Sequence, residues 1–165
     1  MITYDTEVVF QKAVVFTGGV TMPAESIPDS AVKTAAGLQS TKIQQRPRVF
    51  GAQGDSNDTV VADTRVIYVV SGATGTLRNF RIGCVTACTG NATITIDLKK
   101  NGTTVLAAPK VLDNSQIDRQ SVEASIQTQA CVQGDVFELV VTVNAGTGAL
   151  GAGLFWSLTL EETAT

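Results

Sequence analysis

Residues 93–106 read Thr-Ile-Thr-Ile-Asp-Leu-Lys-Lys-Asn-Gly-Thr-Thr-Val-Leu, and this stretch decides the fold class of the chain. The segment 93–98 alternates strictly, which places Ile94, Ile96 and Leu98 on one face of a strand and polar residues on the other. The Asn-Gly pair that follows favours a type I′ turn, in which both central residues adopt positive φ. The pattern therefore predicts a β-hairpin with one buried face that returns along residues 104–106.

The rest of the second half also predicts strands. An apolar run at 66–70 is typical of a strand buried on both faces. Alternating or β-rich segments follow at 79–82, 121–128, 136–143 and 154–160. Seven or eight short strands at this spacing indicate a sandwich, a jelly roll or a barrel.

The first 50 residues have a different pattern. The segment 8–17 is β-prone but has no hairpin partner, and short helices are predicted at 31–36 and at 40–45, the second stopped by Pro47. Because helices shorter than about 12 residues are marginal in water, this part must lie on another surface. We expect an extended N-terminal arm with short helices, which attaches the protein to a partner. The alternative is that its strands complete the main domain.

The chain has 165 residues, enough for one domain with a short appendage. We therefore expect an all-β fold: an arm over 1–50, followed by an antiparallel jelly-roll sandwich over 51–165.

Composition argues against familiar enzymes. The chain has 12 Lys and Arg, 15 Asp and Glu, and no His, so Ser-His-Asp and Cys-His catalysis within this chain is excluded. Charged residues make up 16%, below the ~25% usual for soluble domains. No stretch approaches ~20 apolar residues, and the N-terminus lacks the pattern of a signal peptide. We expect a structural or binding protein that is not an enzyme, with no cofactor, no metal site and no membrane span.

The three cysteines predict no special chemistry. Cys84 and Cys88 lie four apart on a predicted strand, about 13 Å from each other, too far for a disulfide unless the chain bends. We expect them to be small buried hydrophobic residues. Asp55, Asp58 and Asp63 lie in a predicted loop that lacks the pattern of an EF-hand, which indicates a solvated loop.

Three landmarks resemble the tumour-necrosis-factor-like jelly rolls, a superfamily that includes the globular heads of complement and collagen-like proteins. They are Leu-Lys-Lys-Asn-Gly at 98–102, Gly-Asp-Val-Phe-Glu-Leu at 134–139 and Gly-Leu-Phe-Trp-Ser-Leu at 153–158. The resemblance covers residues 60–162 and implies a compact trimer with apolar strand faces at its axis. The apolar side chains left over on two strands agree with such an interface. The expected interface residues are Val66, Tyr68, Val70 and Phe155.

The segment before this domain is similar to N-terminal segments of bacteriophage virion proteins, chiefly head-decoration (cement), head-fibre and tail-fibre proteins. The likeness lies in residues 16–24, Phe-Thr-Gly-Gly-Val-Thr-Met-Pro-Ala, and 27–32, Ile-Pro-Asp-Ser-Ala-Val. It implies a structural virion protein, assembled in the host cytoplasm, whose arm attaches to the capsid and whose trimeric β domain projects. The alternative is the tip of a tail or head fibre that binds a host receptor or surface glycan.

The resemblance implies a homotrimer whose arm binds the major capsid protein, or another virion or tail protein, or a host glycan in the alternative. Nucleic acid is not an expected partner, because the sequence pI is about 4.8 and aromatic residues do not accompany the basic ones. A basic arm that faces an acidic protein shell fits the charges better. The expected attachment residues are Phe10, Val14, Phe16 and Met22 for packing, with Lys33, Arg46 and Arg48 for charge.

Overall fold

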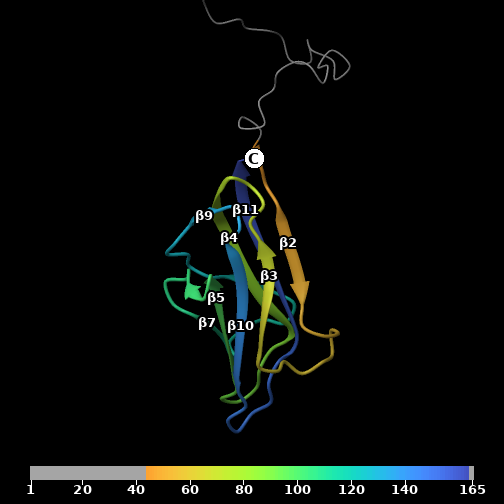
Figure 1. The fold of residues 1–165 in the computed structure, drawn as a ribbon. Helices are drawn as coiled ribbons and strands as arrows, with labels where there is room; N and C mark the ends of the chain where they lie inside the picture. Colours follow the sequence, from red (N-terminus) through yellow and green to blue (C-terminus); the bar gives the residue numbers. More distant parts are fainter. Residues whose placement is uncertain (1–43, 164–165) are drawn as a thin grey trace, which may run out of the picture. The chain divides into compact units, whose positions relative to one another are not determined.

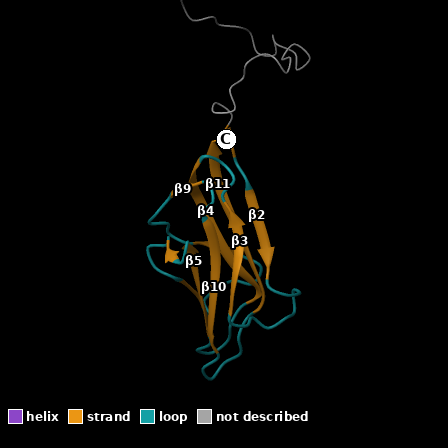
Figure 2. Cartoon of the chain, viewed as in Figure 1, coloured by secondary structure: helices purple, strands orange, loops and turns teal. Residues whose placement is uncertain are grey.

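The computed structural model describes residues 44–163, and these form two packed antiparallel β-sheets without a helix (Figures 1 and 2). This part of the chain is thus all-β, a β-sandwich. The strands are β1 (Gln44–Gln45), β2 (Arg48–Ala52), β3 (Asp63–Val69), β4 (Thr74–Thr86), β5 (Thr93–Lys100), β6 (Thr103–Thr104), β7 (Lys110–Leu112), β8 (Ser121–Glu123), β9 (Ala130–Val132), β10 (Val136–Asn144) and β11 (Ala152–Thr163).

The closing strand β11 organises the first sheet. It pairs with β4 along one side and with β1 and β2 along the other, while β4 also pairs with β8 and β9. The second sheet has the order β3-β10-β5, and β5 continues to β6 and β7. We call them the β11 sheet and the β10 sheet. β2 and β3 lie side by side at one edge of the sandwich (Figure 1).

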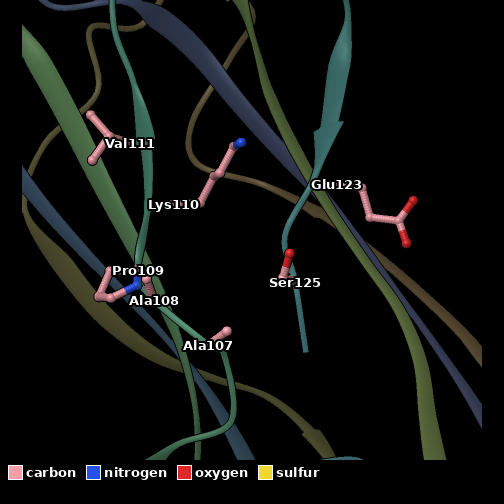
Figure 3. Close-up of a pocket in the computed structure, with 7 residues that line it drawn as sticks. All are labelled: Ala107, Ala108, Pro109, Lys110, Val111, Glu123 and Ser125. Carbon is pink, nitrogen blue, oxygen red and sulfur yellow. The ribbon is translucent and has the colours of Figure 1, made fainter. Parts of the chain in front are cut away.

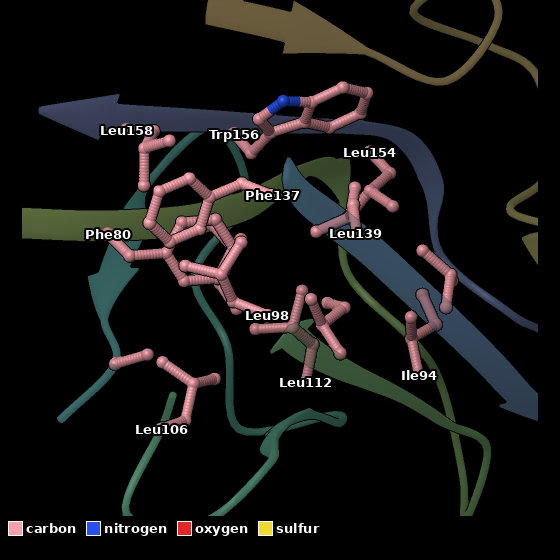
Figure 4. Packing of buried hydrophobic residues seen from close by; sticks show 14 of the residues in the cluster. Phe80, Ile94, Leu98, Leu106, Leu112, Phe137, Leu139, Leu154, Trp156 and Leu158 are labelled. Carbon is pink, nitrogen blue, oxygen red and sulfur yellow. The ribbon is translucent and has the colours of Figure 1, made fainter. Parts of the chain in front are cut away.

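The core between the sheets follows from strand alternation. Ile94, Ile96 and Leu98 of β5 are fully buried, as predicted. They pack in one cluster with residues of the facing sheet, including Phe80 and Leu158 (Figure 4). Burial of each such side chain contributes on the order of 1.5–3 kcal/mol, so this cluster is the main stabilising element of the sandwich.

The predicted Asn-Gly hairpin is confirmed. Asn101 and Gly102 have φ values of 50° and 82°, and they connect β5 directly to β6. Both values lie in the left-handed region that a type I′ turn requires and that Asn and Gly adopt most readily.

The predicted boundary at residue 50 is wrong, because residues 44–52 belong to the sandwich. β1 and β2 both pair with β11, and Gln44–Gln45 are strand where the sequence predicted the end of a helix. Gly51 explains the close docking: a Cβ there would lie 2.3 Å from the Trp156 ring. The remaining predictions for the arm, the strand at 8–17 and the helices over 31–36 and 40–43, lie outside the described residues.

The prediction that residues 66–70 form a strand buried on both faces is also wrong. β3 is an edge strand of the β10 sheet, and Val66 and Val69 are 58% and 51% exposed. The register shifts where Phe137 pairs with Tyr68 but Glu138 pairs with Val66, which leaves Ile67 as an extra residue in β3. Such a bulge reverses the alternation beyond it.

The cysteines are free and buried, as predicted, but the expected wide separation of Cys84 and Cys88 along one strand is wrong. β4 ends at Thr86, so Cys88 lies beyond the strand instead of four residues along it. The Cys88 Sγ lies 3.3 Å from the Gly151 backbone N, and a Cβ on Gly151 would lie 3.4 Å from the Cys84 Sγ. Burial raises the pKa of the Cys84 thiol to about 12, which keeps it protonated and unreactive.

Candidate interaction surfaces

The predicted attachment residues fall into two groups. Arg46 and Arg48 belong to the sandwich. Arg46, between β1 and β2, lies 3.8 Å from the Glu161 carboxylate of β11, and Arg48 is exposed on β2 opposite Thr159. Phe10, Val14, Phe16, Met22 and Lys33 lie outside the described residues.

Glu161 joins Arg46 to a second arginine. Arg78 Nε donates a hydrogen bond of 2.6 Å to Glu161 Oε2, and this bond holds the pKa of the carboxyl below its ordinary value. One carboxylate therefore faces two guanidinium groups on the outer side of β11.

The fold does not bring the four predicted interface residues together. Val66 points away from the core on the β10 sheet, whereas Tyr68 lies opposite the buried Phe137 and therefore points inward. Val70 is 2% exposed, which leaves it no surface for a contact between subunits. Phe155 lies on the outer face of the other sheet. The bulge at Ile67 is the physical reason for the split within β3.

Phe155 already has a partner within its own chain. It pairs with Gly83 across β11 and β4, and a Cβ on Gly83 would lie 2.7 Å from the Phe155 Cζ. The ring therefore lies over the glycine and is half-buried. The need for a subunit contact to cover this side chain is correspondingly smaller.

Four valines on the outer side of the β10 sheet surround Glu138, which shares their face, and the sequence identified this surface only in part. Val66 pairs with Glu138, and Val69 with Val136, across β3 and β10. Val136 and Val140 are half-buried. We call Val66, Val69, Val136 and Val140 the valine face. A prediction of the whole valine face from the sequence would have required both the alternation along β10 and the position of the bulge in β3.

A second surface lies on the outer side of the β11 sheet and was missed. Phe50 is 72% exposed, the highest value among the large hydrophobic side chains described. The signal was present in the sequence, because Arg48, Phe50 and Ala52 alternate with Val49 and Gly51. Assignment of these residues to an arm concealed it.

A buried carboxylate connects the two sheets at the end where residue 44 enters the sandwich. Glu162 is 1% exposed and accepts hydrogen bonds from Tyr68 Oη at 2.7 Å, Gly72 N at 2.8 Å and Ser71 Oγ at 3.1 Å. Burial, together with the bond to Glu162, raises the pKa of Tyr68. Gln45 pairs with Glu162 along the backbone, so this cluster anchors the entry of the chain.

Asp135 forms a second polar cluster that ties two turns together. Its carboxylate accepts hydrogen bonds from Val132 N at 2.9 Å and from Asn101 Nδ2 at 2.7 Å, and Lys100 Nζ lies 3.3 Å away. The bond from Val132, with those from Asn101 and Lys100, lowers the pKa of Asp135. The landmarks at 98–102 and 134–139 in the sequence thus meet at a structural junction.

A groove of about 430 Å³ lies between the edges of β7 and β8, lined by residues 107–111 on one side and by Glu123 and Ser125 on the other (Figure 3). None of these lining residues is aromatic. Small-molecule sites usually combine aromatic or hydrophobic walls with a few directed polar groups, and this lining offers mainly Ala, Pro and Val.

Residues with metal-binding potential are scattered in the part of the chain that the structure describes. Across 44–163, no three His, Cys, Asp or Glu side chains gather closely enough to hold an ion. Asp55 and Asp58 are exposed in a loop, whereas Asp63 begins β3 and pairs with Arg65. No helix of the described residues has the length and apolar character to cross a membrane.

The chain matches no family model and no curated protein.

Proposed function

We propose that this chain is a structural virion protein of a bacteriophage, a homotrimeric capsid decoration protein of the cement or head-fibre type. Residues 1–43 attach it to the major capsid protein of the head shell, and the sandwich of residues 44–163 projects and decorates or stabilises the shell. It acts without catalysis, and its place is the virion, which assembles in the host cytoplasm.

The observation that carries the proposal is the strand order. One sheet runs β2-β11-β4-β8 and the other runs β3-β10-β5-β7. Strands β2, β3, β4 and β5 alternate between the two sheets, β7 stays beside β5, and the last strand, β11, lies between β2 and β4. This order supports a jelly roll, an architecture found in viral capsid and lectin domains. It supports the finer assignment within the β-sandwich class.

The sandwich forms its core and its strand order from residues 44–163, which supports the assignment of residues 1–43 to attachment. The described core runs from Val60 to Leu160, and partly buried Val49 packs against it. The eight-strand order needs nothing upstream of Gln44. The described sandwich therefore forms its core without the segment that contains Phe10, Val14, Phe16, Met22 and Lys33, and we assign that segment to partner binding.

The valine face supports self-association. Val66 and Val69 expose more than half of their surface, and Val136 and Val140 extend the patch across β10. Exposed apolar patches with polar surroundings mark protein contacts more often than isolated apolar residues do. A threefold assembly would also multiply the weak attachment of three arms.

Truncation at the corrected boundary tests the proposal. Phage heads prepared without this protein are mixed with the full chain or with residues 44–165, and bound protein is measured by co-sedimentation. We expect the full chain to bind and the truncated protein to remain folded and trimeric but to bind at least about tenfold more weakly. Failure of the full chain to bind any phage head, or unchanged binding after truncation, would overturn the proposed function or the role of the arm, respectively.

A further inference from the structure

The outer side of the β11 sheet carries an ordered set of side chains that packing among residues 44–163 leaves uncovered. Across β2, β11 and β4, one row contains Phe50, Ser157 and Arg81, and the next contains Arg48, Thr159 and Asn79. Small polar residues of β11 thus separate Phe50 and Arg48 from the side chains of β4. Neighbouring strands lie about 4.8 Å apart, so the two rows span roughly 10 Å.

The excess of positive charge in the described residues lies on this side of the sandwich. Arg46, Arg48, Arg78 and Arg81 lie here with Glu123 and Glu161, a formal charge of +2. The other residues of the described range carry five basic and nine acidic side chains, a formal charge of −4. We call Phe50 and these four arginines the arginine–phenylalanine face.

The pairing within the face leaves positive charge available. Arg46 and Arg78 share Glu161, while Arg81 contacts the exposed Glu123 at 3.2 Å and donates to Ser121. Arg48 forms no salt bridge with any residue from 44 to 163. In the sequence, all charged residues between Ser30 and Gly54 are basic, so the face continues the basic run of the preceding segment.

Phe50 gives the face an apolar anchor. Its side chain is 72% exposed, so most of its apolar surface lies in water and would gain stability from burial against a partner. Aromatic residues and arginine are enriched at the centres of protein interfaces, where a ring fills a pocket and guanidinium groups pair with carboxylates. Glu123 and Glu161, which lie beside these arginines, would repel a phosphate backbone, so the composition of this surface favours a protein partner over nucleic acid.

We propose that the arginine–phenylalanine face docks onto an acidic protein surface, with Phe50 in an apolar pocket and Arg48 and Arg81 opposite carboxylates. This inference rests on the proposed function, in which that surface belongs to the head shell. The sandwich then makes a second, charge-steered contact beside the one made by residues 1–43.

The test uses the full chain and phage heads prepared without it. The variant is Phe50→Ser with Arg48→Glu, and the matched control is Ile117→Ser with Lys110→Glu, which changes an exposed apolar and a basic residue outside the face. Circular dichroism and thermal unfolding verify that both are folded. We expect the variant to bind heads at least about tenfold more weakly, with a weaker dependence on salt, and the control to bind as the wild type does.

Each outcome has a distinct meaning. If the wild type binds heads and the variant binds equally well, the inference is wrong while the proposed function stands. If the wild type does not bind heads, the proposed function is wrong and the inference falls with it. Two further results would also overturn the inference: a smaller mass of the variant by light scattering would assign the face to self-association, and binding of a short DNA duplex by the wild type but not by the variant would assign it to nucleic acid.

Discussion

Two buried carboxylates join strands and turns by hydrogen bonds at the end of the sandwich where residue 44 enters it. Glu162 and Asp135 are each at most 8% exposed, and each collects several donors from different strands and turns. A buried carboxylate is stabilising only when its lone pairs accept hydrogen bonds, so the loss of one donor in either cluster destabilises the fold. The two clusters meet at Val70, which exchanges backbone hydrogen bonds with Gly134 and Asp135.

Tyr68→Phe removes the hydroxyl that donates to Glu162 and keeps the ring. We expect a loss of about 1–3 kcal/mol in the free energy of unfolding at pH 7, because a buried carboxylate loses a donor. The pKa of Tyr68 is raised in the folded state, so its contribution is present below about pH 10 and is lost as the pH rises through the folded pKa. Urea unfolding at pH 7 and near pH 11 should therefore show the difference shrink. Ser71→Ala, which removes a longer bond, serves as the control without a titrating group; an equal difference at both pH values would contradict the account.

Asp135→Asn tests the second cluster at acidic pH. The lowered pKa of Asp135 means that its contribution is present above about pH 4 and is lost as the pH falls through the folded pKa. We expect the variant to be less stable than the wild type by about 1–3 kcal/mol at pH 7, with a smaller difference near pH 3, in urea unfolding. Asp55→Asn, in an exposed loop, should leave stability unchanged at both values. A difference for Asp135→Asn that does not depend on pH would exclude the carboxylate as its cause.

At the scale of strands, strict alternation could be read from the sequence and irregular pairing could not. The segment 93–98 and the Asn-Gly turn after it were predicted correctly, because period-two alternation and paired positive φ values are local properties. The bulge at Ile67 depends on how β3 pairs with β10, which no local pattern reveals. It is the reason that Val66, Tyr68 and Val70 do not share a face.

For the candidate surfaces too, local patterns could be predicted from the sequence and strand pairing could not. Arg46 and Arg48 were identified as interaction residues, but their helix-like surroundings at 40–45 suggested an arm instead of an edge strand. Pairing with β11, more than 100 residues later, is what makes residues 44–52 part of the sandwich. The exposure of Phe50 depends on the pairing of β2 with β11. The role of Glu162 as a buried acceptor depends on the contact between β3 and β11, which no local pattern reveals.

Gly51→Ala tests whether β2 is an integral strand. The new Cβ would lie 2.3 Å from the buried Trp156 ring, so the ring or the strand must shift. We expect a loss of about 1–3 kcal/mol in unfolding free energy and faster amide hydrogen exchange over residues 48–52. Ala52→Ser, on the exposed side of the same strand, should change neither. If both substitutions behave alike, β2 does not dock on Trp156.

At the scale of the whole molecule, two different outer faces suit two different contacts. The valine face consists of four valines around Glu138 and lies on the β10 sheet, and the arginine–phenylalanine face is positively charged and lies on the β11 sheet. Because the two sheets pack on each other through their inner sides, these faces point away from each other. A trimer that uses the first face leaves the second available to another protein.

Val66→Asp tests the proposed trimer. The side chain is 58% exposed in a single chain, so we expect the variant to fold normally but to lose self-association, since a carboxylate resists burial in an apolar contact. Light scattering should give about three times 17.2 kDa for the wild type and 17.2 kDa for the variant. Val111→Asp, at the opposite edge of the same sheet, is the matched control. A monomeric wild type would exclude the trimer, and a trimeric variant would exclude the valine face.

Electron cryomicroscopy of particles of the phage that encodes this protein tests the central claim most directly. The account predicts groups of three sandwiches on the outside of the head, each fitted by residues 44–163 and each connected to the shell by density that continues upstream of Gln44. Particles in which this protein is absent from the head, or is present as single sandwiches joined to the shell at another end, would contradict it.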